Sequence, residues 1–390
     1  MTALLVLVAL VVGLDEFLLA PLLTPIGQGF GVAPERVALM VAAYNLPLAL
    51  LAPVFGRLSD RIGRLAVLRP ALAGFALASF ATALAPNLPA ALAARALTGI
   101  AAAGMLPVAF AVASEAENGA GAIARVQTGL TLGIILGPLN GAVSEGVASW
   151  RMAFAGLGVV AAVLAITSRP AVPRTPAPAA TSEAPRHALA RALPGVAAMF
   201  LGLGGAIGTF ALMGERVRDL FGWDTAQVST VLAGFGAMTV AGNLIAPVLM
   251  RRLGAPRAAA LGLWLVLAGI VVLFVPAMPD AWLAASALAL WAVFGGAAAP
   301  ALQAALAEIG GGQRGLVLAV GSSGLNLGVA LASAGVAELY ARHASFVALL
   351  ACLTVLPAAL VLRKVAASPT VDRSGGIEGA LSDGPPGDRA

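Results

Sequence analysis

The sequence predicts an all-α membrane protein with twelve transmembrane helices arranged as two bundles of six. Of its 390 residues, 60% are hydrophobic and 11% are charged, whereas soluble domains carry about 25% charged residues. Apolar stretches of about 20 residues, the length needed to cross a bilayer, recur twelve times along the chain. A proline-rich segment separates the first six from the last six. These observations place the chain in a lipid bilayer.

The expected spans are stretches of nearly continuous apolar sequence bounded by charged, glycine or proline residues. They cover 3–26, 36–55, 66–86, 89–113, 123–144 and 152–168 in the first half, and 194–214, 226–249, 258–277, 281–304, 315–338 and 344–362 in the second. The first run has no basic segment before it and contains two acids, so we expect a span there and not a cleaved signal peptide.

Four segments follow from this division. Five prolines lie between Arg169 and His187, which is typical of an extended linker without a core of its own. We therefore expect a first bundle over 1–168, a cytoplasmic linker over 169–193, a second bundle over 194–363 and a disordered cytoplasmic tail over 364–390. Two bundles of six are the pattern of parallel repeats related by an axis along the membrane normal.

Charge predicts the orientation and excludes several classes of function. Of the 23 basic residues, 17 fall on one side of the expected spans, 5 on the other and Arg95 inside a span. Because basic residues accumulate in cytoplasmic loops, both termini are expected in the cytoplasm, with the bacterial inner membrane as the location. Their scatter between spans argues against binding of nucleic acid. The single cysteine, Cys352, and the two histidines, His187 and His343, argue against a metal centre, a cofactor and an enzyme.

The loop Gly56–Arg64, with the sequence GRLSDRIGR, carries the sharpest motif. It can be an ordinary positive-inside loop. Its spacing, however, resembles the loop between helices 2 and 3 of the major facilitator superfamily, at the positions Gly56, Asp60, Arg61, Gly63 and Arg64. The resemblance implies a cytoplasmic gate in which Asp60 docks against the positive N-terminal end of the span near Gly315. The corresponding loop of the second half, Met250–Gly254, keeps the glycine but has Arg251 in place of the acid.

Further motifs resemble that superfamily, through Arg95 and Gly99, and within it the branch of twelve-span drug/proton antiporters and sugar-efflux relatives, through the others. They are Leu14–Phe17 followed by Pro21–Leu23, the pair Arg95 and Gly99, the run Gly133, Gly137, Pro138 and Gly141, and Trp150–Arg151. The resemblance covers all twelve spans and implies the superfamily's fold and alternating access driven by a proton gradient. It does not imply a particular substrate.

Asp15 and Glu16 are the acids expected near the middle of the membrane. An acid at that depth is by default a functional site, because burial disfavours its charged form and lets it bind and release a proton. Neighbouring residues point about 100° apart on a helix, so the two cannot face a cavity equally. Asp15 is slightly favoured for proton coupling, and the alternative is a structural partner for Arg95.

Arg95 is expected at nearly the same depth as Asp15. The two differ by four residues measured from the same membrane face, which is roughly 6 Å along the axis. The resemblance links Arg95 to proton transfer, while a purely structural ion pair remains the alternative.

The glycines of the span 123–144 recur every fourth residue and therefore share one helix face, with Pro138 able to bend the helix. The antiporter-like interpretation is a seal against the span 226–249 that prevents leakage. Ordinary packing of small residues is the alternative.

Polar and aromatic residues within the spans are candidates for the substrate cavity, and each of them can equally be a packing residue. They are Phe17, Tyr44, Asn45, Met105, Asn140, Met213, Phe235, Asn243, Trp291, Gln303 and Asn326. A cavity of this composition suits amphipathic or lipophilic solutes.

The sequence as a whole therefore predicts a monomeric, proton-coupled exporter of small amphipathic or lipophilic compounds, with no cofactor and the proton gradient as its energy source. An exporter of a specific sugar or amino acid is the nearest alternative. A membrane sensor without transport activity is the alternative from another class, and the absence of a sizeable soluble domain in the sequence argues against it.

Overall fold

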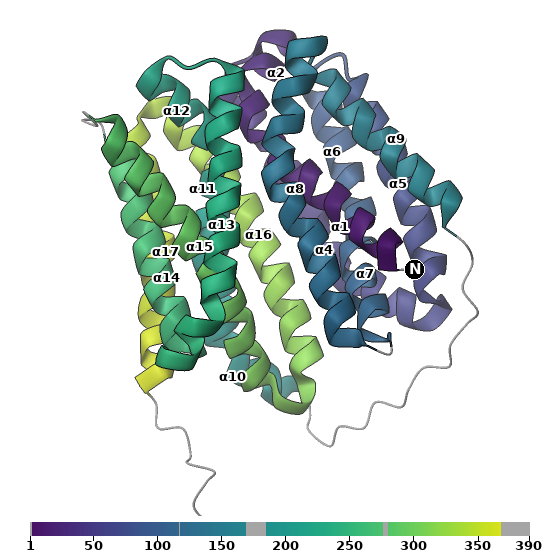
Figure 1. Ribbon diagram of the computed structural model, residues 1–390, viewed down its shortest axis with the longest axis vertical. Helices are drawn as coiled ribbons and strands as arrows, with labels where there is room; N and C mark the ends of the chain where they lie inside the picture. Colours follow the sequence, from purple (N-terminus) through teal and green to yellow (C-terminus); the bar gives the residue numbers. More distant parts are fainter. Residues whose placement is uncertain (1, 117, 169–184, 276–279, 368–390) are drawn as a thin grey trace, which may run out of the picture.

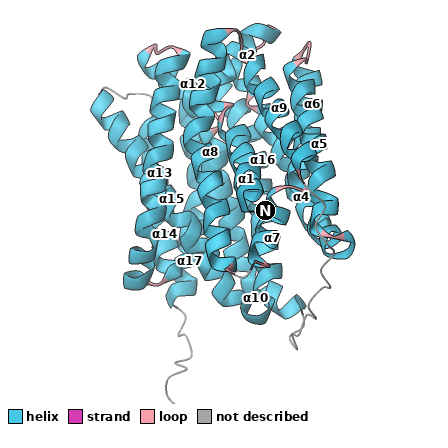
Figure 2. Ribbon diagram, turned by 45° about the vertical axis from the view of Figure 1, so that its right-hand side comes forward, coloured by secondary structure: helices cyan, strands magenta, loops and turns pink. Residues whose placement is uncertain are grey.

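The computed structural model describes residues 2–116, 118–168, 185–275 and 280–367. They form two helical bundles that stand side by side (Figure 1), and Figure 2 contains only helices and loops in these ranges. The predicted division into two halves is visible as a change of colour across Figure 1, from purple and blue to green and yellow.

The first bundle contains six spans. Its elements are α1 (Thr2–Phe17), η1 (Ala20–Leu22), α2 (Leu23–Phe30), α3 (Pro34–Val37), α4 (Leu39–Ile62), α5 (Arg64–Ala83), α6 (Leu88–Ala103), α7 (Leu106–Ser114), α8 (Gly119–Val147) and α9 (Arg151–Thr167). The first span is interrupted beside Pro21, where a short 3₁₀ turn joins α1 to α2. Proline lacks a backbone donor and its ring clashes with the preceding turn, so it kinks or breaks a helix.

The second bundle repeats the pattern. Its elements are α10 (Pro185–Ala198), η2 (Met199–Gly204), α11 (Gly205–Phe210), α12 (Met213–Phe221), α13 (Thr225–Leu253), α14 (Ala255–Phe274), α15 (Ala281–Gly310), η3 (Gly311–Gln313), α16 (Arg314–Arg342) and α17 (Ala344–Ala367). α12 is a short helix that follows the first candidate span of this half, whereas α2 is the last part of the first span in the first half.

The twelve predicted spans correspond to helices of the structure. Within the described ranges, eleven helical segments are long and apolar enough to cross a membrane, and the shorter apolar helix Arg151–Thr167 supplies the twelfth. Several predicted limits differ. α4 continues to Ile62, so residues 56–62, expected to be part of a loop, are helical and the turn is confined to Gly63. α10 begins at Pro185, inside the segment expected to be a linker, and α17 continues to Ala367, past the expected start of the tail. The rest of both predicted segments, 169–184 and 368–390, lies outside the described residues.

The two halves retain the same turn after their second span. Gly63 has φ 101° and ψ 143°, and Gly254 has φ 79° and ψ 155°. This conformation is essentially restricted to glycine. The repeat seen in the sequence is thus conserved in backbone geometry, although Arg251 replaces the acid.

The ends of the bundle differ in their basic residues. We call the end that carries Arg36, Arg151, Arg216, Arg218 and Arg342 the arginine-poor end, and the opposite one the arginine-rich end. In Figure 1, α2 and α12 lie together at the top, which is the arginine-poor end, and α10 lies at the bottom. Between the halves, the most extensive contacts join α4 to α16 and α8 to α13.

Candidate functional site

An ion pair between α1 and α6 lies inside the first bundle. Arg95 Nη1 is 2.6 Å from Asp15 Oδ1, and the side chains are 2% and 0% exposed. The depth argument from sequence had put these two residues within reach, and the structure joins them. A buried guanidinium needs such a partner, because an unpaired charge in a low-dielectric interior is costly.

The position of Arg95 depends on a close approach between two helices. Gly99 lies one turn from Arg95, and a Cβ added to it would be 2.0 Å from the carbonyl oxygen of Tyr44. Only glycine allows α4 to pass so near. The same approach sets the Tyr44 ring under the guanidinium, whose Cζ is 4.6 Å from the ring centroid. The two residues of the Arg95–Gly99 motif therefore have complementary structural roles.

The ion pair leaves some of its polar atoms without partners. Asp15 Oδ2, Arg95 Nε and Tyr44 Oη are buried and make no hydrogen bond to the protein. Buried polar atoms are nearly always hydrogen-bonded in folded proteins. This cluster therefore has the capacity for further hydrogen bonds to water or to another polar group.

Glu16 faces a different environment from its neighbour. It lines a small cavity of about 20 Å³ between the two bundles, at the level of Phe17 and Asn45. Unlike Asp15, it takes part in none of the ion pairs found within the described residues. The first bundle also contributes Leu19, Ala20 and Val41 to the cavity, and the second contributes Ile207, Phe210, Ala211 and Val329.

Three aromatic candidates gather beside this cavity around Phe210, which the sequence analysis did not select. Phe210 lies 5.7 Å from Phe17 across the two halves, measured between ring centroids, 4.8 Å from Phe235 and 6.3 Å from Trp291. The wall of the cavity is therefore largely apolar and aromatic. One polar atom stands out, since Asn45 Oδ1 is buried without a hydrogen-bond partner.

The remaining cavity candidates are dispersed. Met105 is fully buried at the junction of α6 and α7, and Met213 is fully buried at the start of α12. Asn140 lines a separate groove of about 410 Å³ formed by α1, α8 and α9. Asn326 donates to the Ser322 carbonyl oxygen of its own helix. Asn243 is half-buried on α13 and Gln303 is exposed on α15. None of these six residues lines the small cavity beside Glu16.

The glycine face of α8 packs against α1. Added Cβ atoms at Gly133 and Gly137 would lie 2.6 Å from the backbone of Gly13 and 3.0 Å from the carbonyl oxygen of Leu14, and Gly141 continues the same face. The expected contact between this helix and 226–249 is present, but the glycine face does not make it. α13 contacts α8 through another face, where Gly236 approaches Ile134 and Ile135. The physical consequence is that the motif sets the depth and rotation of α1, and with it Asp15 and Glu16.

The motif Gly56–Arg64 at the arginine-rich end lies on the last turns of α4, the Gly63 turn and the first residue of α5, and its contacts stay within its own bundle. Arg64 pairs with Asp60, and its Nη2 is 2.9 Å from Glu115 Oε1 on the segment after α7. The Asp60 side chain is 55% exposed, and open space surrounds the Cβ direction of Gly315. The predicted docking of Asp60 near Gly315 is absent from this structure. The Gly56 carbonyl oxygen accepts a hydrogen bond from the Ser59 hydroxyl, and the Arg61 side chain is exposed.

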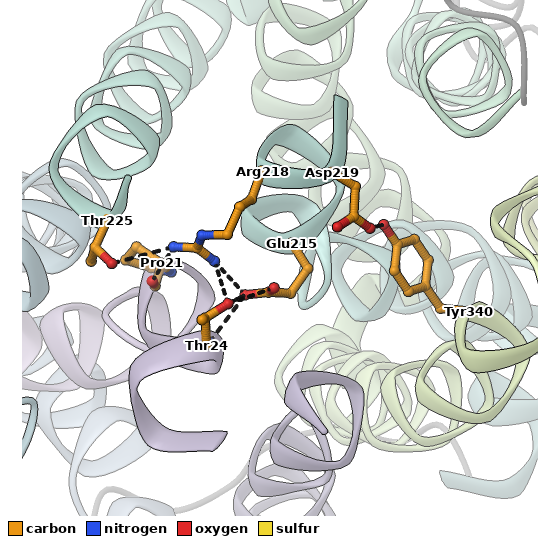
Figure 3. A network of polar contacts seen from close by, with 7 residues as sticks. All are labelled: Pro21, Thr24, Glu215, Arg218, Asp219, Thr225 and Tyr340. Atoms are coloured by element: carbon orange, nitrogen blue, oxygen red, sulfur yellow. Dashed lines mark hydrogen bonds and ion pairs between the residues drawn. The ribbon is translucent and has the colours of Figure 1, made fainter. Parts of the chain in front are cut away.

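A polar network at the arginine-poor end joins the two bundles, and the sequence analysis did not identify it. Figure 3 shows Glu215 and Arg218 of α12 reaching Thr24 of α2. Glu215 is only 5% exposed. Burial raises the pKa of its carboxyl above the ordinary value, although Arg218 and the hydrogen bond from Thr24 act in the opposite direction.

No metal centre is found in the part of the chain that the structure describes, since no three His, Cys, Asp or Glu side chains are placed to hold an ion. The described residues offer two carboxyls near the middle of the first span, a buried cation, a largely apolar cavity between the two halves, and a polar contact that joins the halves at the arginine-poor end.

Solved structures share this fold. The model superposes on the crystal structure of a D-xylose–proton symporter with a TM-score of 0.73 and 17% identity, covering 93% of this chain and 96% of that one. The nucleoside transporter NupG gives a TM-score of 0.75 at 13% identity, with 93% and 98% covered. At these identities the likeness concerns the fold alone.

Sequence relatives add two kinds of protein. A triacylglyceride transporter of Mycolicibacterium hassiacum is 36% identical over 141 residues, which is 35% of this chain and 26% of that protein. The match thus spans about a quarter of that relative's length. An uncharacterized MFS-type transporter of Bacillus subtilis, YfhI, is 27% identical over 333 residues and 82% of both chains.

The family model of the Major Facilitator Superfamily matches residues 5–214, more than half of the chain. That region includes the ion pair of α1 and α6, the acid at the cavity and the loop motif described above. This chain therefore belongs to the Major Facilitator Superfamily, a non-enzymatic family of multi-pass membrane transporters.

Proposed function

We propose that this transporter couples the export of small amphipathic or lipophilic compounds to protons by alternating access. The observation that carries the proposal is the division between two neighbouring acids. Asp15 is neutralised by Arg95 inside the first bundle, whereas Glu16 lines the cavity between the bundles. The cavity has room for about one water molecule in this structure. A carboxyl in that position can therefore meet a proton here, and a substrate once the bundles move and widen the cavity, which is the requirement for coupling their movements.

Glu16 is the proton-exchanging group in this proposal, and Asp15 has a supporting role. Protonating Asp15 would leave the buried guanidinium of Arg95 without a counter-charge. Protonating Glu16 leaves no such cation behind. The Asp15–Arg95 pair then fixes the rotation of α1, so that Glu16 points towards the second bundle.

The composition of the cavity wall and the nature of the relatives both favour a lipophilic substrate. Phe17, Phe210 and the aliphatic side chains beside them favour apolar groups over several charged ones. Relatives described as triacylglyceride transporters, although matched over a third of this chain, are consistent with a lipophilic cargo. A hydroxyl-bearing metabolite is the second candidate, because Asn45 Oδ1 offers a buried acceptor at the cavity.

The proposed orientation has the arginine-rich end and both termini in the cytoplasm of a bacterial cell. A single chain contains both halves of the cycle, so a monomer is sufficient for transport.

Proteoliposomes with an imposed pH gradient test the proposal. Lumenal pH is followed while triacylglycerol, lipophilic cations, dyes, sugars and amino acids are offered in turn. The protein should give substrate-evoked proton flux, Glu16→Gln should abolish that flux, and Glu338→Gln at an exposed ion pair should leave it unchanged. Transport that proceeds without proton movement would refute the coupling. Flux evoked only by a sugar or an amino acid would favour the second candidate.

A further inference from the structure

The short helix α12 at the arginine-poor end has two functionally different faces. Arg216 and Asp219 fasten it to its own bundle. Arg216 donates from Nε to the Leu273 carbonyl oxygen at 2.7 Å and from Nη2 to that of Val275 at 2.9 Å, and Asp219 accepts a hydrogen bond from the Tyr340 hydroxyl. The α12 helix therefore moves with the second bundle.

Glu215 and Arg218 lie on the face that meets the first bundle, three residues apart and therefore one above the other. Thr24 donates its backbone N–H to Glu215 Oε1 at 3.1 Å and its hydroxyl to the two carboxylate oxygens at 2.8 and 2.7 Å. Arg218 Nη1 donates to the same hydroxyl at 2.7 Å and to Glu215 Oε1 at 2.6 Å. Figure 3 shows these contacts converging on Thr24.

A close backbone approach at Gly214 also brings α12 against η1 of the first span. A Cβ added to Gly214 would lie 2.1 Å from the carbonyl oxygen of Ala20 in η1. Because the obstacle is backbone, no side-chain rotation can relieve it. Any side chain at position 214 would hold α12 away from η1, so the glycine is required for the closed contact.

We propose that α12 and the α2–η1 segment form the outer gate of this transporter, and that Glu215 is a proton-binding site created when the gate closes. Its ligand is a proton, and its surroundings come from both halves. Rocking the halves apart removes Thr24 and admits water to the carboxyl, so the two states of the gate present Glu215 with two environments. A group whose environment differs between two states couples their equilibrium to pH.

The charges that face Glu215 belong to α12 itself. Arg218 favours the ionised form of Glu215. Asp219, which accepts a hydrogen bond from the Tyr340 hydroxyl, disfavours that form. Arg216 is directed towards the carbonyl oxygens of Leu273 and Val275. The packing segments α2 and η1 contain no charged residue, and Thr225 of α13 contributes a hydroxyl to Arg218.

The sign of the coupling follows from burial. In the closed gate the pKa of Glu215 is raised, chiefly by loss of water, whereas an open gate returns the carboxyl to solvent and towards an ordinary pKa of about 4.3. The state with the higher pKa gains stability as the pH falls. Acid therefore favours closure, and that preference fades as the pH rises above the pKa of the closed state. This sign does not depend on the proposed function. Which compartment supplies the proton does depend on it, because the orientation of the chain in the membrane is part of that proposal.

The experiment measures the distance across the gate. Cys352 is replaced by alanine, and spin labels are attached at Ala33→Cys and His343→Cys, two exposed positions at the arginine-poor end of different halves. Distances are recorded by pulsed electron paramagnetic resonance in nanodiscs between pH 8 and pH 5. The readout needs neither substrate nor a pH gradient, so it succeeds or fails independently of the proposed transport activity.

We expect the short-distance population to increase at least several-fold as the pH falls. Glu215→Gln, which resembles the protonated side chain, should keep that population high at every pH. Glu338→Gln, at an ion pair 70% exposed at the same end, should follow the parent protein. A distribution that ignores pH, or a Glu215→Gln variant that responds as the parent does, would overturn the assignment of Glu215.

A wedge variant tests the gate itself. Gly214→Ala should shift the labels to the long distance at all pH values, whereas Gly234→Ala, at an exposed position of α13 with open space around it, should not. Size-exclusion profiles establish that both variants fold. A folded Gly214→Ala protein that still closes like the parent would overturn the proposed gate.

Discussion

Arg95 and Asp15 form an ion pair of 2.6 Å in which neither side chain is more than 2% exposed. The pair ties α6 to α1 and lies beside the one acid, Glu16, that reaches the cavity between the bundles. Because both charges are buried, the pair stabilises the fold only as long as both partners are present.

Removing one partner of this pair should destabilise the first bundle. Asp15→Asn or Arg95→Gln leaves an uncompensated buried charge or polar group and should reduce the unfolding free energy by about 3–5 kcal/mol. The double variant Asp15→Leu with Arg95→Met should recover much of that loss. Unfolding titrations in mixed detergent micelles measure the effect, with Arg342→Gln at an exposed pair as the matched control. Equal stability of the single and double variants would contradict the role of the pair.

Glu16→Gln should separate coupling from binding. The amide keeps the size and the hydrogen-bonding capacity of the side chain but cannot exchange a proton. We expect exchange of substrate across the membrane without a pH gradient to persist, and accumulation driven by a gradient to fall at least tenfold. Measuring both in the same proteoliposomes checks the prediction, and parallel loss of the two activities would indicate a binding role instead.

The glycine face of α8 should be intolerant of side chains where it meets α1. At Gly133 an added Cβ lies 2.6 Å from backbone atoms, so Gly133→Ala must displace α1 and should lower both stability and transport. Gly146 on the same helix has open space around it. Gly146→Ala should be neutral or stabilise by about 0.5–1 kcal/mol, the usual difference between these residues in a helix. Thermal unfolding of the pair of variants provides the comparison.

The loop at the arginine-rich end should affect the rate of transport more than stability. Asp60 is more than half exposed and bonded to Arg64 of its own bundle, and exposed ion pairs contribute little to folding. Asp60→Asn should leave the melting temperature nearly unchanged while reducing the transport rate several-fold. A large loss of stability would mean that the loop is a structural clamp and not a gate.

The sequence predicted the spans well because the bilayer imposes their length, and it predicted the proximity of Asp15 and Arg95 because depth can be counted in residues. Helix rotation is harder to predict. The division between Asp15 and Glu16 depends on which face of α1 packs against α8. The glycine spacing indicated a packed face but not its partner, which is α1 and not α13.

Two other features could not be predicted for different reasons. In this structure the partner of Asp60 is Arg64 of its own bundle, and the spacing of the motif does not indicate how near the span at Gly315 lies. In the sequence, Arg218 contributes only to the count of basic residues on one side of the membrane, and Glu215 belongs to no motif. The available signal was two i,i+3 combinations of opposite charge, Glu215 with Arg218 and Arg216 with Asp219, offset by one residue. They lie about 100° apart on the short helix, and one contacts the first bundle while the other contacts the second.

Proton release on binding tests the central claim most directly. Purified protein in a weakly buffered detergent solution is mixed with the compound that evokes proton flux in proteoliposomes, and a pH indicator reports the protons set free. The account predicts about one proton released per bound molecule near neutral pH, none from Glu16→Gln, and unchanged release from Glu338→Gln. Release that persists in Glu16→Gln would contradict the assignment of coupling to the acid that faces the cavity.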